Sequence, residues 1–388
     1  MIKTLKIKLK PNNKQQIKMF QFAGAKRFAY NWTLAKQEEN YKNGGKFIQD
    51  NELRKEFTQL KKQEEYSWLN SVSNNVTKQA IKDACISYKR FFKRQSKFPK
   101  FKSKKHDRPS FYVDNVKIKF TATHVKLEHI ATSKKKNKAK LNWIRLVEKN
   151  KIPIDCKYVN PHIVYDGVNW FITVGIEYQD LENKTTKEGI GIDLGLKDLA
   201  ICSNGNIHKN INKTKKVKKL EKRKRRLQRR ISKKYLLNKE GEYYRKTSSI
   251  IKSEKKLLKL NQRLTNIRDN YLHQVTSEII KRNPSFITIE DLNVKGMMRN
   301  KYLSKAVQQQ KFYELRRQLE YKSKWSNIEL RIVDRYFPSS KLCHECGSIK
   351  SNLKLSDRIY ICKECGNVID RDYQASLNLR DATIYKIA

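Results

Sequence analysis

The chain has 388 residues, enough for two or three domains, and is strongly basic: 87 Lys and Arg against 38 Asp and Glu give a net charge of +49. This excess favours an extended polyanion as partner, a nucleic acid before an anionic membrane. No apolar run approaches the roughly eighteen residues of a membrane span. Residues 1–9 alternate like a strand and do not resemble a signal peptide. We therefore expect an intracellular protein with no membrane partner.

The first hundred residues begin as a strand and continue as helices. Pro11 ends the strand pattern of residues 1–9, and from Ile17 onward apolar residues recur three and four apart. Further helices fit residues 51–65 and 73–94. The last of these carries amide and basic side chains that can read base edges in a groove, although a solvated polar face is the alternative. The candidate nucleic-acid contacts on it are Asn75, Lys78 and Gln79.

A basic linker, residues 95–109, leads into a segment with a period of two. Its lysines and phenylalanines suit a loop that follows phosphates and stacks on bases. We expect residues 1–20 and 110–184 to form one small antiparallel β-barrel or sandwich, with residues 21–109 as a helical insertion. The six strands predicted after the linker are Ser110–Val113, Val116–Phe120, His124–Leu127, Trp143–Val147, Tyr158–Tyr165 and Trp170–Tyr178.

A change of composition at residues 182–187 marks the start of the second half. Residues 189–205 predict two strands joined by a turn, with Asp193 deep in the first apolar strand. A lone carboxylate in such a place is costly unless it binds a cation or accepts hydrogen bonds. Asp193 is therefore a strong functional candidate.

A dense basic helix follows. Residues 213–235 hold fourteen Lys or Arg, one acid and an apolar stripe. Charges at this density repel one another without counterions, so the pattern predicts a helix that faces nucleic acid; a disordered basic tail is the alternative. The arginines expected to contact nucleic acid are Arg225, Arg226 and Arg229.

Four further elements complete the second half before the cysteines begin. Apolar periodicity predicts a long helix over residues 250–282 and, after Pro284, a buried strand over residues 286–292 that contains Glu290. A helix over residues 308–322 and a strand over residues 328–333 follow.

The last fifty residues contain two CxxC pairs separated by fifteen residues, each followed by glycine. This spacing brings four thiolates onto one tetrahedral zinc ion, and glycine suits the tight turn after each second cysteine. Two disulfides are the competing interpretation, which the lack of any secretion signal disfavours. The predicted zinc ligands, in a ribbon over residues 339–368, are Cys343, Cys346, Cys362 and Cys365.

Two acids, Asp370 and Asp372, open a short apolar-periodic segment beside this ribbon. Asp193, Glu290 and Asp372 come from separate elements around one predicted sheet, as a two-metal phosphodiesterase requires, because carboxylates hold Mg²⁺ ions that activate water. A helix cap is the alternative interpretation of an acid in this place, and it suits Asp370, which is also the alternative to Asp372 as the third ligand. The chain has no GxxxxGK[ST] loop, so nucleotide hydrolysis is not supported.

Several stretches of the second half form a specific combination. They are the sequence GIDLG at 191–195, IEDL at 289–292, the approach YFPSSKLC at 336–343, the two CxxC pairs and Asp370-Arg371-Asp372. This combination resembles the TnpB proteins, transposon-encoded RNA-guided DNA endonucleases with a RuvC-type nuclease domain, related to the ancestors of type V CRISPR effectors. Gln374 departs from the family, which usually has Asn there, and Ser376 stands where Ala is common. Neither departure removes a metal ligand, so we expect activity to be retained.

The resemblance implies a multidomain fold of α+β and α/β parts. Residues 1–20 and 110–184 would form a wedge-like β-barrel, and residues 21–109 a helical recognition domain. Residues 185–388 would form an RNase H-like RuvC domain, into which the zinc ribbon at residues 339–368 is inserted.

The resemblance also implies the activity and its partners. Asp193, Glu290 and Asp372 would hold two Mg²⁺ ions, with Asp372 preferred to Asp370 as the third ligand. The partners would be a guide RNA from the transposon end and a double-stranded target DNA, recognised beside a short motif while base pairing reads the rest. The expected location is a prokaryotic cytoplasm, in association with the nucleoid.

Three other functions stay open at this point. The chain could be an RNA-guided DNA-binding repressor without cleavage, or a transposition accessory protein that binds DNA. The presence of all three acids argues against both. A compact type V CRISPR effector is the third alternative, which the neighbouring genome would separate from a transposon protein.

Overall fold

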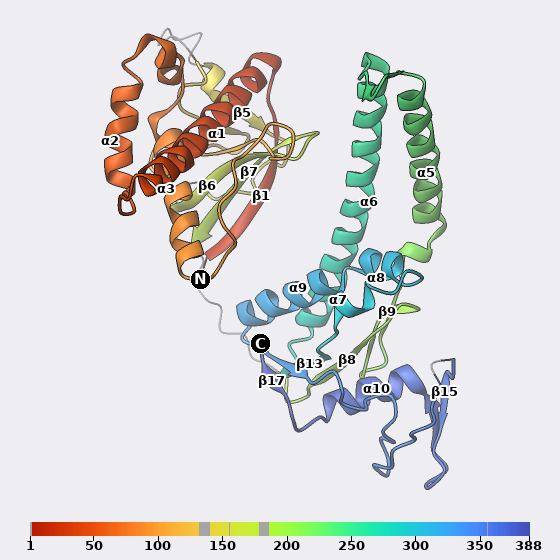
Figure 1. The fold of residues 1–388 in the computed structure, drawn as a ribbon. Coiled ribbons are helices and arrows are strands. Elements are labelled where there is room, and N and C mark those ends of the chain that lie inside the picture. Colours follow the sequence, from red (N-terminus) through yellow and green to blue (C-terminus); the bar gives the residue numbers. More distant parts are fainter. Residues whose placement is uncertain (1, 132–139, 155, 178–185, 355) are drawn as a thin grey trace. The chain divides into compact units, whose positions relative to one another are not determined.

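The computed structural model describes residues 2–131, 140–154, 156–177, 186–354 and 356–388. The chain divides into two compact units, residues 1–179 and 180–388, and each mixes helices with a β-sheet (Figure 1). The composition change predicted at residues 182–187 falls largely outside the described residues. None of the described helices combines the length and the apolar character needed to cross a membrane.

Three helices of unit 1 follow its first strand. Helix α1 (Asn13–Lys42) begins at a capping box, in which the Asn12 side chain accepts from the Gln15 backbone and the Gln15 side chain accepts from the Asn12 backbone. Helix α3 (Asn74–Phe92) begins at the N-cap Ser73 and agrees with the prediction to within two residues at either end.

The helix predicted over residues 51–65 is too long. Helix α2 (Asp50–Leu60) ends five residues earlier, and Glu64–Ser71 form 3₁₀ turns. The chain turns at Lys61, whose carbonyl oxygen accepts a hydrogen bond from the Asn70 side chain at 3.2 Å. This turn delivers Leu69 to the core, where it is fully buried, so tertiary packing overrides the helical pattern.

The strands of unit 1 form one sheet in the order β2-β6-β7-β1-β5-β4-β3. The first strand lies between β7 and β5 and pairs antiparallel with both, which confirms the expected pairing of residues 1–9 with later strands. Among the described residues no pairing joins the end strands β2 and β3, so closure into a barrel stays a prediction. The strands are β1 (Ile2–Lys10), β2 (Ser110–Tyr112), β3 (Lys119–Phe120), β4 (His124–Lys126), β5 (Trp143–Leu146), β6 (Tyr158–Tyr165) and β7 (Trp170–Glu177).

The strand predicted over residues 116–120 is correct only in its second half. The Asp114 side chain accepts hydrogen bonds from the backbone N–H groups of Val116 (3.0 Å) and Lys117 (3.1 Å), which holds this part in a turn.

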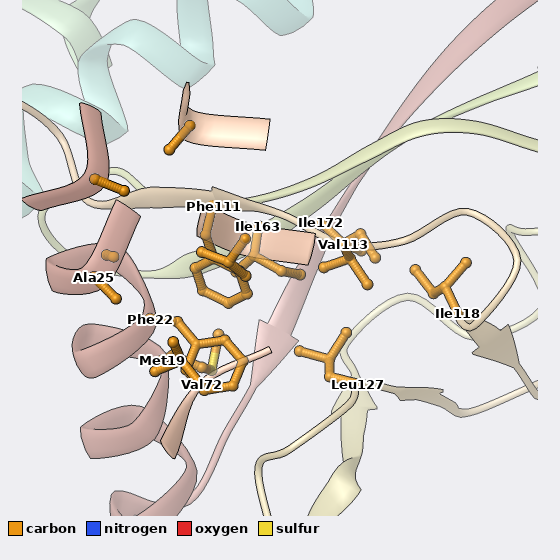
Figure 2. Packing of buried hydrophobic residues seen from close by; sticks show 14 of the residues in the cluster. Met19, Phe22, Ala25, Val72, Phe111, Val113, Ile118, Leu127, Ile163 and Ile172 are labelled. Atoms are coloured by element: carbon orange, nitrogen blue, oxygen red, sulfur yellow. The ribbon is translucent and has the colours of Figure 1, made fainter. Parts of the chain in front are cut away.

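The core of unit 1 lies between α1 and the sheet. Figure 2 shows Met19 and Phe22 of α1 beside Phe111 of β2 and Ile163 of β6, all buried. The rings of Phe22 and Phe111 meet edge to face with centroids 5.3 Å apart. The helices are therefore packed on the sheet through α1 and form part of the same core.

The sheet of unit 2 has the order β10-β9-β8-β13-β14-β17. Strands β10, β9 and β8 form an antiparallel meander, β13 and β14 continue it in parallel with β8, and β17 closes the edge antiparallel. Strand β10 was not predicted. The strands are β8 (Ile190–Leu194), β9 (Asp198–Cys202), β10 (Ile207–Lys209), β13 (Phe286–Glu290), β14 (Glu329–Val333) and β17 (Lys386–Ile387).

Two long antiparallel helices extend from this sheet, α5 (Lys215–Leu236) and α6 (Ser248–Lys281) (Figure 1). A short hairpin of β11 (Lys239–Glu240) and β12 (Tyr243–Tyr244) joins them. The lower part of α6 packs on the sheet through Leu272 and its apolar neighbours.

The helix predicted over residues 308–322 is two helices, α8 (Ser304–Gln310) and α9 (Phe312–Trp325), which follow the short α7 (Val294–Met297). The break is at Lys311, which adopts a left-handed conformation with φ of 57°. Its ammonium group pairs with Asp269 of α6, and the break allows Phe312 to enter the core.

Helix α10 (Arg371–Arg380) lies directly against β8. A Cβ atom at Gly191 would overlap the carbonyl oxygen of Ser376 and the backbone nitrogen of Arg380. Glycine at position 191 therefore permits the close approach of the second half of α10 to β8. The strands β15 (Ile359–Ile361) and β16 (Val368–Asp370) form a small hairpin before α10.

Candidate active site, cysteine cluster and nucleic-acid interface

Two neighbouring parallel strands deliver the first two predicted acids to one place. The register of β8 and β13 sets Ile192 beside Ile289, so Asp193 and Glu290 follow them at adjacent positions on the two strands. Ile192 and Ile289 are fully buried in the core. Because side chains alternate along a strand, the two acids point away from that core and toward the opposite face.

The third acid comes from the first turn of α10. Asp370 is the N-cap of this helix and accepts hydrogen bonds from the backbone N–H groups of Asp372 and Tyr373, both at 3.0 Å. Its interpretation as a helix cap is confirmed. Asp372, with its backbone fixed by that cap, lines one cleft together with Asp193 and Glu290, whereas Asp370 does not line it.

This cleft has a volume of about 750 Å³ and lies wholly within unit 2. Its walls are the ends of β8 and β13, the segment 335–341 and part of the cysteine module, which is the region of the predicted zinc ribbon, residues 339–368. Apart from the acids, its charged lining is mostly basic, which suits a polyanion that must approach carboxylates. The basic side chains at its walls are Lys197, Arg335, Lys341, Lys354, Arg358 and Arg371.

The electrostatics of the acids differ from those of ordinary surface carboxylates. Burial, then the negative charges of Asp372 and Glu290, raise the pKa of Asp193 to about 7. Burial, with the charge of Asp291, raises the pKa of Glu290 to about 7. Asp291 itself forms ion pairs with Arg316 and Arg335, which hold the pKa of its carboxyl low.

Asp372 has two guanidinium partners. Arg371 donates to its Oδ1 from Nη2 at 2.8 Å and from Nε at 3.0 Å, and Arg358 donates to its Oδ2 at 3.2 Å. Within the described parts of the chain, the four clustered cysteines are the one set of three or more His, Cys, Asp or Glu whose ligand atoms all lie within 4.8 Å of one another. The three acids thus share a cleft, but their carboxylate oxygens do not all lie within 4.8 Å of one another.

The four predicted zinc ligands meet in one cluster, with Cys343 and Cys362 buried and Cys346 and Cys365 exposed. The Sγ atoms of Cys343 and Cys365 are 3.6 Å apart, as are those of Cys346 and Cys362. A tetrahedral zinc tetrathiolate with Zn–S distances of about 2.3 Å has sulfurs roughly 3.8 Å apart. A disulfide bond requires about 2 Å. The donors present therefore fit zinc, and the disulfide interpretation is wrong.

The turn after each CxxC pair has the tight backbone conformation that its glycine predicted. Gly347 has φ of 74° and Gly366 has φ of 73°, values that favour glycine. Fully buried Tyr360 packs beneath the cluster with Leu353 and Ile369.

The cysteine module is attached to α10 at two points. The Asn378 side chain donates to the carbonyl oxygens of Ser339 and Leu342, both at 2.7 Å, on the approach to Cys343. At the other end, the backbone of Arg371 donates to the carbonyl oxygen of Arg358 at 2.9 Å. The module therefore contacts both the helix that carries Asp372 and the side chain of Asp372 itself.

The α5–α6 pair forms a basic groove of about 440 Å³ with an apolar floor of Leu227 and Leu260. Of the predicted contacts, Arg226 lines this groove, Arg225 lines a second one on the same helix pair, and Arg229 is exposed but lines neither. The cations of α6, which recur three and four residues apart, were not among the predicted contacts. The cations of the first groove are Arg223, Arg226, Arg230, Lys256, Lys259 and Arg263.

The polar face predicted on α3 is partly engaged within the protein. Asn75 donates to Glu128 at 3.4 Å, and Gln79 donates to Asp83 at 2.8 Å. Lys78 is exposed and lines a pocket between α2 and α3. Reading of bases by these residues stays a prediction.

Three family models match the chain. They are a helix-turn-helix domain of OrfB_IS605 proteins over residues 1–46, the OrfB_IS605 probable transposase over residues 172–301, and the Cas12f1-like TNB domain over residues 312–379. The second match contains Asp193 and Glu290, and the third contains the four cysteines and Asp372. In place of two helices joined by a turn, the region of the first match folds as strand β1 and one helix, α1.

Two relatives match nearly the whole chain. A protein of Streptomyces pristinaespiralis named "Putative RNA-guided DNA endonuclease" is 28% identical over 97% of this chain and 88% of its own length. InsQ of Escherichia coli, named in the same way, is 27% identical over 97% of this chain and 91% of its own length. The CRISPR-associated endodeoxyribonuclease Cas12f1 of Sulfoacidibacillus thermotolerans is 29% identical over 34% of this chain and 31% of its own length.

The fold is similar to that of the Cas12f1 chain in a cryo-EM structure of a Cas12f1–sgRNA–target DNA complex. The TM-score is 0.63 at 13% identity, over 100% of this chain and 99% of that one. This likeness concerns the fold, and it agrees with the mixed α+β architecture of two units. The chain thus contains domains matched by the OrfB_IS605 and Cas12f1-like TNB family models, and along nearly its whole length it is similar to proteins named RNA-guided DNA endonucleases.

Proposed function

We propose that the chain is an RNA-guided DNA endonuclease of a transposable element, which hydrolyses DNA phosphodiester bonds beside a short flanking motif. The observation that carries this proposal is the cleft in which β8, β13 and α10 bring Asp193, Glu290 and Asp372 together within basic walls. The names of the relatives that match the whole chain support it.

The nuclease part of the proposal is an RNase H-like, RuvC-type domain in unit 2. The sheet supports it: an antiparallel meander is extended by two parallel strands, and the acids stand where the parallel strands end. In open sheets with parallel strands, sites form outside the carboxyl ends of those strands. We also propose that residues 1–20 and 110–184 form the wedge domain and that residues 21–109 form the recognition domain.

The carboxylates fit Mg²⁺, a hard cation that takes oxygen ligands. Burial and neighbouring negative charges raise the pKa of the Asp193 and Glu290 carboxyl groups to about 7. Without a bound cation, the protein therefore disfavours the ionised forms of both groups. We propose that Asp193, Glu290 and Asp372 hold two Mg²⁺ ions. Bound there, the ions would activate the attacking water and stabilise the leaving oxygen.

The chain's own cations would place the nucleic acid. The basic walls of the cleft, among them Lys197 and Arg335, would hold the phosphates on both sides of the bond to be cut. Arg358 and Arg371 form ion pairs with Asp372 in this structure. When Asp372 holds a metal ion, both guanidinium groups would be free to pair with a substrate phosphate.

Two further partners complete the proposal. The four cysteines would bind one Zn²⁺, which fixes the module that Asn378 anchors to α10. The cations of the α5–α6 groove would bind backbone phosphates of a guide RNA or of its duplex with target DNA. Base pairing between guide and target would supply the sequence specificity.

One observation favours a second candidate, an RNA-guided DNA-binding protein without cleavage. Arg358 and Arg371 form ion pairs with Asp372 and balance its charge. If these ion pairs persisted in the DNA-bound protein, Asp372 could not serve as a metal ligand. A compact type V CRISPR effector is chemically equivalent to the first proposal and differs from it in genetic context.

The test is to express the protein together with its own flanking DNA and to sequence the RNA that copurifies. A discrete RNA ending beside the transposon supplies the guide for a cleavage assay on a matching duplex with and without Mg²⁺. We expect cleavage by the natural protein and none by Asp193→Ala or Glu290→Ala, with RNA and DNA binding retained. Guide-dependent binding without cleavage would support the second candidate, and the absence of a discrete RNA would reject both.

A further inference from the structure

A pocket of about 390 Å³ lies between α2 and α3, and all the residues that line it belong to unit 1. It contains four cationic side chains, and no carboxylate lines it. Polar uncharged side chains supply the rest of its hydrogen-bonding groups. Its cationic and hydrogen-bonding side chains include those of Arg54, Lys61, Lys62, Asn74, Thr77 and Lys78.

The central residue of the pocket is Lys61, which is only 8% exposed. Its ammonium group donates to Asn74 Oδ1 at 2.7 Å and to Thr77 Oγ1 at 3.3 Å, and it lies 5.5 Å from the centre of the Phe57 ring. All of these partners are uncharged. Burial and the positive charge of Lys78 lower the pKa of Lys61, so the surroundings disfavour its charged form.

The other cations add to this positive charge. Arg54 is held by Asp50 at 2.8 Å, and its buried Nε has no hydrogen-bond partner in the described structure. Lys62 and Lys78 are exposed, and neither forms an ion pair with any residue that the structure describes. Three ammonium groups thus face one pocket with no carboxylate lining it.

A buried cation without a counter-charge destabilises a protein, and an apolar side chain of similar length would fold at lower cost. A ligand that carries negative charge would balance such a cation, which gives a reason for its presence in the site. Lysine ammonium groups are compact donors that suit phosphate oxygens, and Arg54 Nε offers one more N–H. The pocket therefore has the charge and the donors of a phosphate site.

We propose that this pocket binds a phosphate group of a nucleic-acid strand, with Lys61 as its central ligand and Lys62 and Lys78 at its mouth. The strand as the source of the phosphate rests on the proposed function, since a chain with a net charge of +49 is suited to a polyanion. The site fixes the position of unit 1 on the backbone, because phosphate contacts position a protein while base contacts specify sequence.

The experiment compares full-length protein freed of nucleic acid with Lys61→Met and Lys78→Met. Lys61→Met keeps the aliphatic stem of the side chain and removes the charge, while Lys78→Met changes an exposed residue and leaves the fold intact. The matched control is Lys55→Met, an exposed lysine of α2 outside the pocket. Binding to a 20-base-pair DNA duplex and to a single-stranded RNA is measured over a range of salt concentrations.

We expect Lys61→Met to melt at the same temperature as the natural protein or higher, and to bind at least roughly tenfold more weakly. The slope of log K against log salt should fall by roughly 0.7 to 0.9 for Lys61→Met and for Lys78→Met, and should not change for Lys55→Met. A smaller slope with the duplex, with the RNA or with both supports the site and identifies which strand occupies it.

The proposal would be overturned if the slope of log K against log salt were unchanged in Lys61→Met and Lys78→Met with both ligands. It would also be overturned if Lys55→Met changed the slope by the same amount. A lower melting temperature of Lys61→Met combined with unchanged slopes would identify Lys61 as a structural residue. This result is separate from the endonuclease assay. The slope can change in a protein that does not cleave, and cleavage can occur with every slope unchanged.

Discussion

The guanidinium group of Arg358 lies 3.2 Å from Oδ2 of Asp372. Arg358 directly precedes β15 of the cysteine module, and Asp372 belongs to the first turn of α10, so this ion pair joins the predicted zinc site to the predicted metal site of the nuclease. The same carboxylate is bound by Arg371 at 2.8 Å. A cation that binds Asp372 must therefore displace guanidinium groups that already balance its charge.

Replacing Arg358 should strengthen metal binding. Arg358 is nearly half exposed, and such pairs contribute roughly 0.2–1 kcal/mol, so Arg358→Gln should raise the affinity for Mn²⁺, used as a probe for Mg²⁺, by up to about fivefold. Mn²⁺ binding measured by calorimetry or electron paramagnetic resonance tests this without catalysis. Arg380→Gln, which breaks the similarly exposed pair with Asp381, is the control and should leave the affinity unchanged. Weaker Mn²⁺ binding by Arg358→Gln would contradict the displacement argument.

The raised pKa of Asp193 predicts how stability depends on pH in Mg²⁺-free buffer. The folded protein keeps a proton on Asp193 up to about pH 7, whereas the unfolded chain loses it near pH 3.8. The native state thus binds more protons between these values, and the free energy of unfolding falls as pH rises through them. Asp193→Asn removes this effect, so it should stabilise the protein at pH 8 by at least about 1.4 kcal/mol, the equivalent of one pKa unit. Near pH 4 it should make little difference.

Chemical denaturation at several pH values measures this, and Asp291→Asn provides a control of opposite sign. Arg316 and Arg335 lower the pKa of Asp291, so that substitution should destabilise the protein at neutral pH and lose its effect as the pH falls. A destabilising Asp193→Asn at pH 8 would show that the ionised Asp193 has a stabilising partner in the folded protein.

Local sequence patterns were sufficient for the elements that carry the acids. Asp193 and Glu290 lie in apolar runs that predict buried strands. The register of those two strands places the two acids at adjacent positions. What could not be predicted depends on tertiary contacts. The break at Lys311 follows from a side chain that reaches Asp269, and the pairing of Arg358 with Asp372 joins residues fourteen positions apart across the cysteine module. Neither interaction leaves a periodic signal in the sequence.

Removing one cysteine should release zinc and loosen α10. Cys343→Ser replaces a buried member of the tetrathiolate cluster, and structural zinc sites contribute directly to folding. Metal analysis should find about one zinc per natural chain and much less in the variant, together with a lower melting temperature. Cys156→Ser, outside the cluster, should change neither quantity. Full zinc content in Cys343→Ser would reject the assignment of the cluster.

The α5–α6 groove should bind backbone phosphates without reading sequence. Lys259→Ala and Arg263→Ala remove cations of α6 that line it, and each should weaken binding of unrelated nucleic acids by a similar factor and reduce the salt slope by roughly 1. Lys252→Ala is the control, because Lys252 is an exposed lysine of the same helix that does not line the groove. A loss confined to one sequence would indicate base contacts instead.

Gln374 gives a prediction about stability beside the active cleft. It lies on α10, is fully buried, and neither its Nε2 nor its Oε1 has a hydrogen-bond partner within the described chain. Leaving a buried amide unsatisfied costs roughly 1–3 kcal/mol, so Gln374→Met, which has a similar volume and no such need, should stabilise the protein by about that amount in denaturant titrations. Asn378→Leu is the contrasting variant and should destabilise, since Asn378 makes two hydrogen bonds of 2.7 Å that anchor the cysteine module. If Gln374→Met destabilises the protein instead, the amide binds a ligand or water in solution, and the departure from the family's usual Asn has a role in the site.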